Sequence, residues 1–163
     1  MHDQSVAVFD HFLGALSKVL AKAEAHCEAH KIDPAALLTA RLFPDMFTFT
    51  RQVQLATDFA KGPSARLAGV EIPSFEDTET TFGTLQARIA KTREFLATIT
   101  PAMLDGAAMR TIRFRARGQD HEAPGRAYLS MVALPNFYFH TTTAYNILRH
   151  NGVELGKGDF VGR

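Results

Sequence analysis

The sequence predicts an all-α protein: an up-down four-helix bundle with a small β-hairpin inserted before the last helix. Two segments, from Gln4 to Ala29 and from about Ser74 or Asp77 to Thr98, place apolar residues at steps of three and four, the spacing of an amphipathic helix. Only the segment from Met109 to Arg117 alternates apolar and polar residues strictly, as a strand does. One strand-like segment among helical ones makes a helical bundle the simplest architecture.

The composition is that of one globular domain spanning residues 1–163. Of these 163 residues, 46% are hydrophobic and 21% are charged, which is enough apolar material for a sizeable core. The 18 basic and 17 acidic side chains leave a net charge of +1, so we expect neither nucleic acid nor an acidic membrane as a partner. Cys27 is the only cysteine and excludes an intrachain disulfide. The N-terminus lacks a signal-peptide pattern, and no apolar run approaches the ~18 residues of a membrane span, so we expect a cytoplasmic location.

The first predicted helix carries two apolar rows, so we expect it to pack against two neighbours or against a partner subunit. At its end, His26 and His30 are four residues apart with Cys27 between them, a spacing that can hold a metal ion. The alternative is a pair of cationic side chains at a helix C-terminus, where the helix dipole favours positive charge. We favour this alternative because no third histidine is close in sequence.

The second predicted helix runs from about Pro44 to Lys61, with Asp45 in its first turn and Gly62-Pro63 at its end. Its residues leave little polar face, so the helix should be mostly buried. Polar side chains on a buried helix need hydrogen-bond partners. The polar residues that stand out for this reason are Arg51, Gln52, Gln54 and Asp58.

The third predicted helix has a clear division between its two sides. Its acidic residues from Glu76 to Glu79 suit the first turn, where the helix dipole favours negative charge. An apolar stripe from Phe82 to Ile99 should face the core. The residues that we expect on the solvent side are Gln86, Arg88, Lys91, Arg93 and Glu94.

The strand-like segment from Met109 to Arg117 is followed by a turn at Gly118 and a short second strand from His121 to Ala123. The arginines on its polar face are compatible with nucleic-acid binding. We favour a solvated hairpin, because no aromatic platform accompanies the arginines and acidic residues lie across the turn. The following segment, from Pro124 to Ala133, should be extended or irregular, because a proline at 135 inside a helix would clash with the carbonyl of Met131.

The last helix should begin at Pro135 or Asn136 and end at Gly152, with a tail after it that docks on the bundle. This helix is shorter than the first, so part of the bundle stays uncovered. The hairpin and the segment from Tyr128 to Leu134 are available to close that gap, and a pocket would form there. His140 lies beside the apolar stripe, where a histidine is either a hydrogen-bonded core residue or a ligand or catalytic group.

Two runs of residues resemble a known family. They are Arg41-Leu-Phe-Pro-Asp-Met46 followed by Gln52, and Leu134-Pro-Asn-Phe-Tyr-Phe-His140 continuing through Leu148-Arg149 to Gly152-Val153. The chain is similar to an uncharacterised bacterial family within the DinB/YfiT-like superfamily of four-helix bundles. The resemblance implies the bundle fold and a homodimer. It also implies that many relatives bind a divalent metal through three histidines and that some are thiol-dependent transferases or isomerases.

The resemblance also indicates how the site differs here. His140 falls at one of the two histidine positions of the last helix, and Asn136 takes the place of the other. The second helix has no histidine, and Gln52 or Asp45 stands near that place. We therefore predict a polar cluster of Gln52, Asn136 and His140 without a metal cofactor, because amides are poor ligands for zinc or nickel.

Three functions are open at this stage. The first is a protein with a polar pocket around catalytic candidate His140 that binds an unknown small molecule. Its candidate ligand-binding residues are Asn136, Gln52, Asp45 and Tyr138. The second is a divergent metal- or thiol-dependent transferase with His140 as ligand or general base. The third is a non-catalytic dimeric interaction module.

Overall fold

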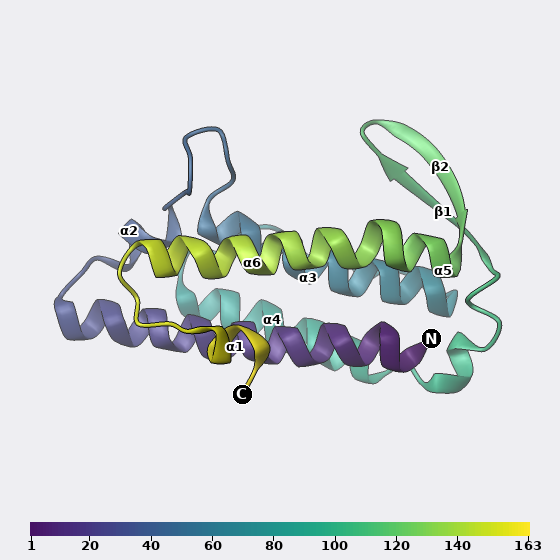
Figure 1. Ribbon diagram of the computed structural model, residues 1–163, viewed down its shortest axis with the longest axis horizontal. Helices are drawn as coiled ribbons and strands as arrows, with labels where there is room; N and C mark the ends of the chain where they lie inside the picture. Colours follow the sequence, from purple (N-terminus) through teal and green to yellow (C-terminus); the bar gives the residue numbers. More distant parts are fainter.

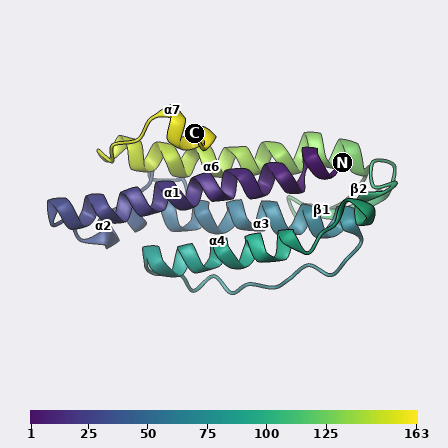
Figure 2. The ribbon, with the colours of Figure 1, turned by 90° about the horizontal axis from the view of Figure 1, so that it is seen from below.

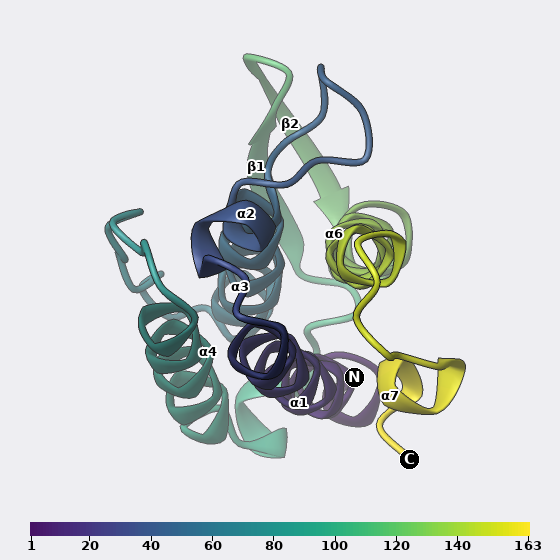
Figure 3. The ribbon, with the colours of Figure 1, turned by 90° about the vertical axis from the view of Figure 1, so that its left-hand side faces the viewer.

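The computed structural model describes residues 1–163 and confirms a helical bundle with one hairpin before the last long helix (Figure 1). Four long helices lie side by side: α1 (Val6–His30), α3 (Phe49–Ala68), α4 (Phe82–Ala97) and α6 (Leu134–His150). Seen end-on, α1 lies beside α3 and α4, and it contacts each of the other three long helices (Figure 3). This explains why its sequence carries two apolar rows. No helix combines the length and hydropathy needed to cross a membrane.

The core is rich in phenylalanine, as the composition suggests. Phe9, Phe49, Phe82 and Phe137 are all 2% exposed or less. The rings of Phe9 and Phe137 meet edge to face with centroids 4.9 Å apart, which joins α1 to α6. The rings of Phe49 and Phe82 lie 6.1 Å apart.

The contact between Phe49 and Phe82 also defines the direction of the helices. These are the first residues of α3 and α4, so both helices begin at the same end of the bundle. Residues 69–81 must therefore return along the whole bundle, and they do so beside α4 (Figure 2). This crossover connection is the one departure from a simple up-down order.

The second helix differs from its prediction at both ends. Residues 41–48 form a loop, and α3 begins at Phe49 because the Thr48 side chain caps it by accepting from the backbone N–H of Arg51 at 3.3 Å. The prediction that Gly62-Pro63 ends the helix is wrong. The helix continues through Pro63 to Ala68 and stops at Gly69, whose φ is +73°. The buried packing of this last turn offsets the ~3 kcal/mol that an interior proline costs.

The segment before the last helix is helical, not extended as predicted. It comprises α5 (Gly125–Tyr128) and a π-helical turn, η3 (Leu129–Ala133), and it runs without a break into α6. A π turn bonds residues five apart and is wider than an α turn. Its extra width accommodates Pro135 without the expected clash at the carbonyl of Met131.

Helix α4 begins later than predicted. Its N-cap is Thr81, which exchanges hydrogen bonds with Thr84 in a capping box. The acidic residues Glu76, Asp77 and Glu79 therefore lie in the 69–81 connector and not in the first helical turn. Asp77 and Glu79 pair there with arginines and do not complement the dipole of α4.

The predicted hairpin is confirmed. Strands β1 (Thr111–Ala116) and β2 (Gln119–Pro124) pair antiparallel and project from one end of the bundle (Figure 1). Ile112 is buried, and the ring of Phe114 packs on Tyr128 with centroids 4.9 Å apart. The apolar face of the hairpin therefore covers the start of the α5–η3–α6 segment.

Four smaller helical elements complete the fold. They are η1 (His2–Gln4), α2 (Pro34–Leu38), η2 (Pro101–Leu104) and α7 (Lys157–Val161). The tail docks on α1 through α7, as expected (Figure 2). Phe160 of α7 packs between the rings of Phe12 and Tyr145, at centroid distances of 5.5 and 5.8 Å.

Candidate functional site

His140 of α6 and Gln52 of α3 face each other across the bundle. The Nδ1 atom of His140 lies 2.7 Å from Oε1 of Gln52, and Nε2 of Gln52 donates to the backbone carbonyl of Phe47 at 3.4 Å. Because the amide nitrogen is used by Phe47, the amide oxygen faces the imidazole and accepts the proton of Nδ1. The neutral ring is thereby held as the Nδ1–H tautomer, which leaves the lone pair on Nε2.

The surroundings of His140 keep the ring neutral. His140 is 7% exposed, stacks on Phe59 at 5.5 Å and meets the edge of Phe139 at 5.3 Å. The pKa of His140 is lowered to about 4: burial is the largest cause, the positive charge of Arg51 also lowers the pKa, and the carboxylate of Asp58 partly opposes both. The imidazole is therefore uncharged at neutral pH.

The structure separates the other predicted site residues from this pair. Asn136 is half-buried, but its amide donates to the carbonyl of Val132 at 2.7 Å and not to His140. Tyr138 packs on Phe12 of α1 at 5.1 Å, because two residues along a helix turn a side chain to the far side. Asp45 lies exposed in the 41–48 loop, because α3 begins only at Phe49.

A pocket of about 550 Å³ lies between α3, the hairpin and the α5–η3–α6 segment. The prediction placed the pocket around His140. The pocket instead adjoins His140, because Phe59 stacks on the imidazole and forms part of the wall. Asn136, one turn before His140, also lines it. The full lining is Leu55, Asp58, Phe59, Pro63, Arg66, Phe114, Arg115, Ala116, Arg117, Tyr128, Val132 and Asn136.

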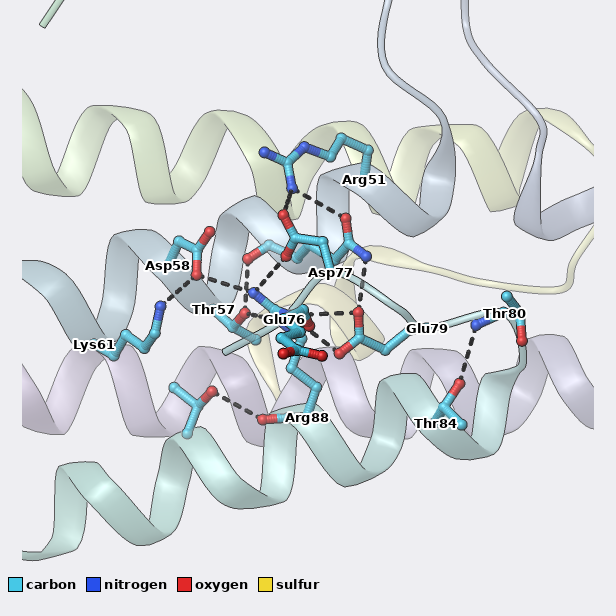
Figure 4. A network of polar contacts seen from close by, with 12 residues as sticks. Arg51, Thr57, Asp58, Lys61, Glu76, Asp77, Glu79, Thr80, Thr84 and Arg88 are labelled. Carbon is cyan, nitrogen blue, oxygen red and sulfur yellow. Dashed lines mark hydrogen bonds and ion pairs between the residues drawn. The ribbon is translucent and has the colours of Figure 1, made fainter. Parts of the chain in front are cut away.

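A buried ion-pair network lies next to the pocket and shares Asp58 with it (Figure 4). Its centre is Arg88 of α4, whose side chain is 2% exposed. The guanidinium donates to Thr57 at 2.7 Å and to the carbonyl of Glu76 at 3.0 Å. It also contacts three carboxylates, at distances of 3.0 Å for Asp58, 3.0 Å for Asp77 and 3.1 Å for Glu79.

The prediction that Arg88 faces solvent is wrong, because the 69–81 connector covers that side of α4. The sequence does hold a signal for it: Arg88 lies three residues after Leu85 and four before Thr92, both of which are buried. The prediction that the polar residues of α3 need partners is confirmed. Arg51 pairs with Asp77, Gln54 donates to Glu79 at 2.8 Å, and Asp58 accepts from Lys61 at 2.5 Å and from Arg88.

A comparison with known protein families identifies the family of this chain. A family model described as a domain of unknown function, DUF1993, matches residues 1–161. The chain belongs to the DUF1993 family. This confirms the resemblance to an uncharacterised family.

A solved structure confirms that this DUF1993 protein has a DinB-like fold. The crystal structure of a DinB family member protein from Shewanella denitrificans is 42% identical, with a TM-score of 0.94. The match covers 99% of the DUF1993 chain and 92% of the other chain. No curated protein matches.

The three-histidine metal site that the superfamily implies does not fit the residues of this DUF1993 protein. No three or more His, Cys, Asp or Glu side chains gather where they could hold a metal ion. At His140, the Gln52 oxygen is occupied by the imidazole itself, and the Asn136 amide is bonded within α6. One imidazole nitrogen without further donors is not a zinc or nickel site.

The end of α1 offers no alternative metal or catalytic site. The rings of His26 and His30 lie 4.2 Å apart, and Nδ1 of His30 is 2.9 Å from the carbonyl of His26. Cys27, which lies between them in the sequence, is buried in the core, and burial raises the pKa of its thiol. A buried thiol with a raised pKa is a weak nucleophile, so Cys27 is a packing residue.

Proposed function

We propose that this protein binds a small molecule in the pocket between α3, the hairpin and the α5–η3–α6 segment, and that the neutral imidazole of His140, which adjoins this pocket next to Phe59, serves as a hydrogen-bond acceptor. The observation that carries this proposal is the fixed state of the imidazole. Gln52 holds Nδ1, and Nε2 has no hydrogen-bond partner within the protein. The only fully buried polar side-chain atom without a partner is Oγ of Ser64, so Nε2 is within reach of solvent.

The shape of the chain around the pocket supports the same proposal. Val132 of the π turn η3 lines the pocket, and so do Tyr128 and Asn136 on either side of it. A π turn is a costly departure from the α-helix and occurs frequently at functional sites. The volume of the pocket, about 550 Å³, is within the range of small-molecule sites.

Binding is favoured over acid–base catalysis by the state of His140. A general base works best when its pKa lies near the working pH. With a pKa of about 4, His140 would be a weak base at neutral pH. A neutral acceptor that does not change charge suits ligand recognition better than proton transfer.

A thiol-dependent transferase is the second candidate, because the unpartnered Nε2 would be available to a thiol S–H. An enzyme of this kind would consume a low-molecular-weight thiol in an electrophile-transfer assay, and His140→Gln would remove that turnover.

Assembly as a homodimer in the cytoplasm is also proposed. The homodimer is supported by three exposed side chains, which are Phe43 (64%), Phe47 (54%) and Phe139 (55%). Light scattering of the purified protein measures the mass of the assembly.

The binding proposal is tested by a fragment screen followed by NMR of the ¹⁵N-labelled protein. We expect hits from the screen to shift the side-chain amide of Asn136 and the backbone signals of Tyr128 and Val132. Val132→Phe should fill the pocket and remove these shifts. Ala90→Phe introduces a phenylalanine at an exposed position of α4, away from the pocket, and should leave them intact.

Either of two results would contradict the proposal. One is that no fragment at millimolar concentration shifts a signal from the pocket. The other is that the hits bind Val132→Phe as they bind the unaltered protein. Thermal unfolding of both variants checks that each is folded.

A further inference from the structure

We infer that the pocket selects organic anions: molecules with a carboxylate, or a group of like charge and shape, attached to an apolar body. This inference rests on the proposed function and specifies its ligand class. It is carried by the charges that line the pocket, by their lack of acidic partners, and by the apolar walls opposite them.

The pocket has an excess of positive charge. Arg66 of α3 and the hairpin residues Arg115 and Arg117 line it, and Asp58 is its only carboxylate. Asp58 already pairs with Arg88 at 3.0 Å and with Lys61 at 2.5 Å. Its negative charge is therefore already paired with two cations, and it does not balance the three arginines.

None of these three arginines pairs with an acidic side chain in the structure. Arg115 donates to the carbonyl of Gly118 at 3.2 Å, and Arg66 donates to the hydroxyl of Tyr128 at 3.3 Å. By contrast, Arg51 and Arg88 of the neighbouring network both contact carboxylates. A half-buried guanidinium such as Arg66 loses hydration without gaining a counter-ion, and an anionic ligand would supply one.

Arg66 and Tyr128 form a natural pair of donors to one anionic group. The phenol oxygen of Tyr128 accepts from Nη1 of Arg66, so the phenol proton is free to donate elsewhere. Burial raises the pKa of Tyr128, which keeps the phenol protonated at neutral pH. Two adjacent donors of this kind match the two oxygens of a carboxylate.

Most of the remaining lining of the pocket is apolar. Leu55 and Phe59 come from α3, Val132 comes from η3, and Phe114 comes from the hairpin. These side chains would contact an aliphatic or aromatic body but give no reason to bind a small inorganic ion. The concave form of the site also favours a small molecule over a nucleic-acid strand, for which the hairpin offers no row of stacking aromatic residues.

A matched series of probes tests the inference on the full-length protein by NMR titration. The probes are 3-phenylpropionate, its neutral isostere 3-phenylpropionamide, and acetate, which has the charge without the apolar body. We expect the acid to bind at least about tenfold more tightly than the amide, because a charge-assisted hydrogen bond adds at least that factor. Acetate should bind more weakly than 3-phenylpropionate, and added salt should weaken the binding of the acid.

Variants assign the preference to the arginines. Arg66→Gln should lower the affinity for the acid at least about tenfold and bring it to that of the amide. The double variant Arg115→Gln, Arg117→Gln alters only the hairpin and gives the same test if Arg66→Gln does not fold. Arg93→Gln removes an exposed arginine of α4 and should leave the preference unchanged.

Equal affinity for the acid and the amide, or an unchanged affinity for the acid in both arginine variants, would overturn the inference. So would the failure of both aromatic probes to bind. In each case the fragment screen separates the two proposals. Neutral fragments that still shift pocket signals leave the proposed function intact, whereas the absence of any pocket hit overturns both.

Discussion

At the scale of single residues, the chemistry of His140 is decided by two neighbours from another helix. Gln52 selects the tautomer through a hydrogen bond of 2.7 Å, and Phe59 removes one face of the ring from water. The same imidazole on an exposed helix would titrate near its usual pKa of ~6.5. Here it is held in one neutral form.

The low pKa of His140 predicts a pH dependence of stability. The pKa falls from 6.5 to about 4 on folding, so the unfolded chain binds a proton between these values and the folded chain does not. This contribution is absent above pH ~6.5, and it destabilises the fold progressively as the pH falls toward ~4. The full effect of a single histidine would be roughly 3 kcal/mol.

The comparison with His140→Leu isolates this effect. Free energies of unfolding from urea denaturation should fall more steeply between pH 7 and pH 4 for the unaltered protein than for the variant. The midpoint of the His140 ring signals in an NMR titration gives the pKa directly. Parallel curves for the two proteins, or a midpoint near pH 6.5, would show that the ring is not held neutral.

At the scale of elements, the junction between the hairpin and the last long helix is the most constrained part of the chain. The N–H of Gly125 donates to the carbonyl of Arg110 at 2.8 Å, which joins the start of α5 to the segment before β1. A Cβ atom at Gly125 would lie 2.0 Å from the carbonyl oxygen of Ala107. The approach of two backbones, and not a turn, therefore requires glycine here.

We predict that Gly125→Ala destabilises the protein by about 3 kcal/mol or more, because the colliding atom belongs to the backbone and cannot move aside. Gly83→Ala is the matched control within α4. There the added Cβ meets only Oγ1 of Thr81 at 3.8 Å, so the change should be neutral or stabilise by up to about 1 kcal/mol. Urea midpoints of the two variants measure the difference, and equal midpoints would refute the argument.

At the scale of the whole molecule, a long connector joins α3 to α4, where a simple up-down bundle would use a tight turn. The buried network of Arg88 holds this connector against the bundle. Because α3 and α4 begin at the same end, the connector must cross back over the bundle. Asp77 and Glu79 of the connector bind Arg88, and Arg51 adds a second contact to Asp77. The connector is thus attached to both helices by charge and not by secondary structure.

We predict that Arg88→Ala costs about 3–5 kcal/mol, because it leaves carboxylates without their buried partner. Arg93→Ala, on the same helix, removes a pair with Asp10 in which both side chains are more than two-fifths exposed, and should cost less than about 1 kcal/mol. Amide hydrogen exchange of residues 70–80 should accelerate in the first variant only. Similar losses in both variants would mean that the network does not hold the connector.

Much of the fold could be predicted because it depends on local patterns. The apolar rows of α1 predicted a helix with neighbours on two sides, and the alternation around Phe114 predicted the hairpin. The boundaries near proline could not be predicted in this way. Pro63 remains inside α3 because its turn is buried, and Pro135 follows a π turn that no local pattern announces. Both outcomes depend on packing that the sequence does not display.

For the candidate site, the sequence by itself determined the residue types: one histidine on the last long helix, a glutamine on the second, and no set of residues for a three-histidine metal site. Only the tertiary structure decided which of them meet. Gln52 and His140 are 88 residues apart and touch because α3 packs on α6, while Tyr138, only two residues from His140, faces α1. The arginines of the hairpin likewise join Arg66 only through folding. Periodicity determines which face of a helix a residue occupies, but the packing of helices determines what that face meets.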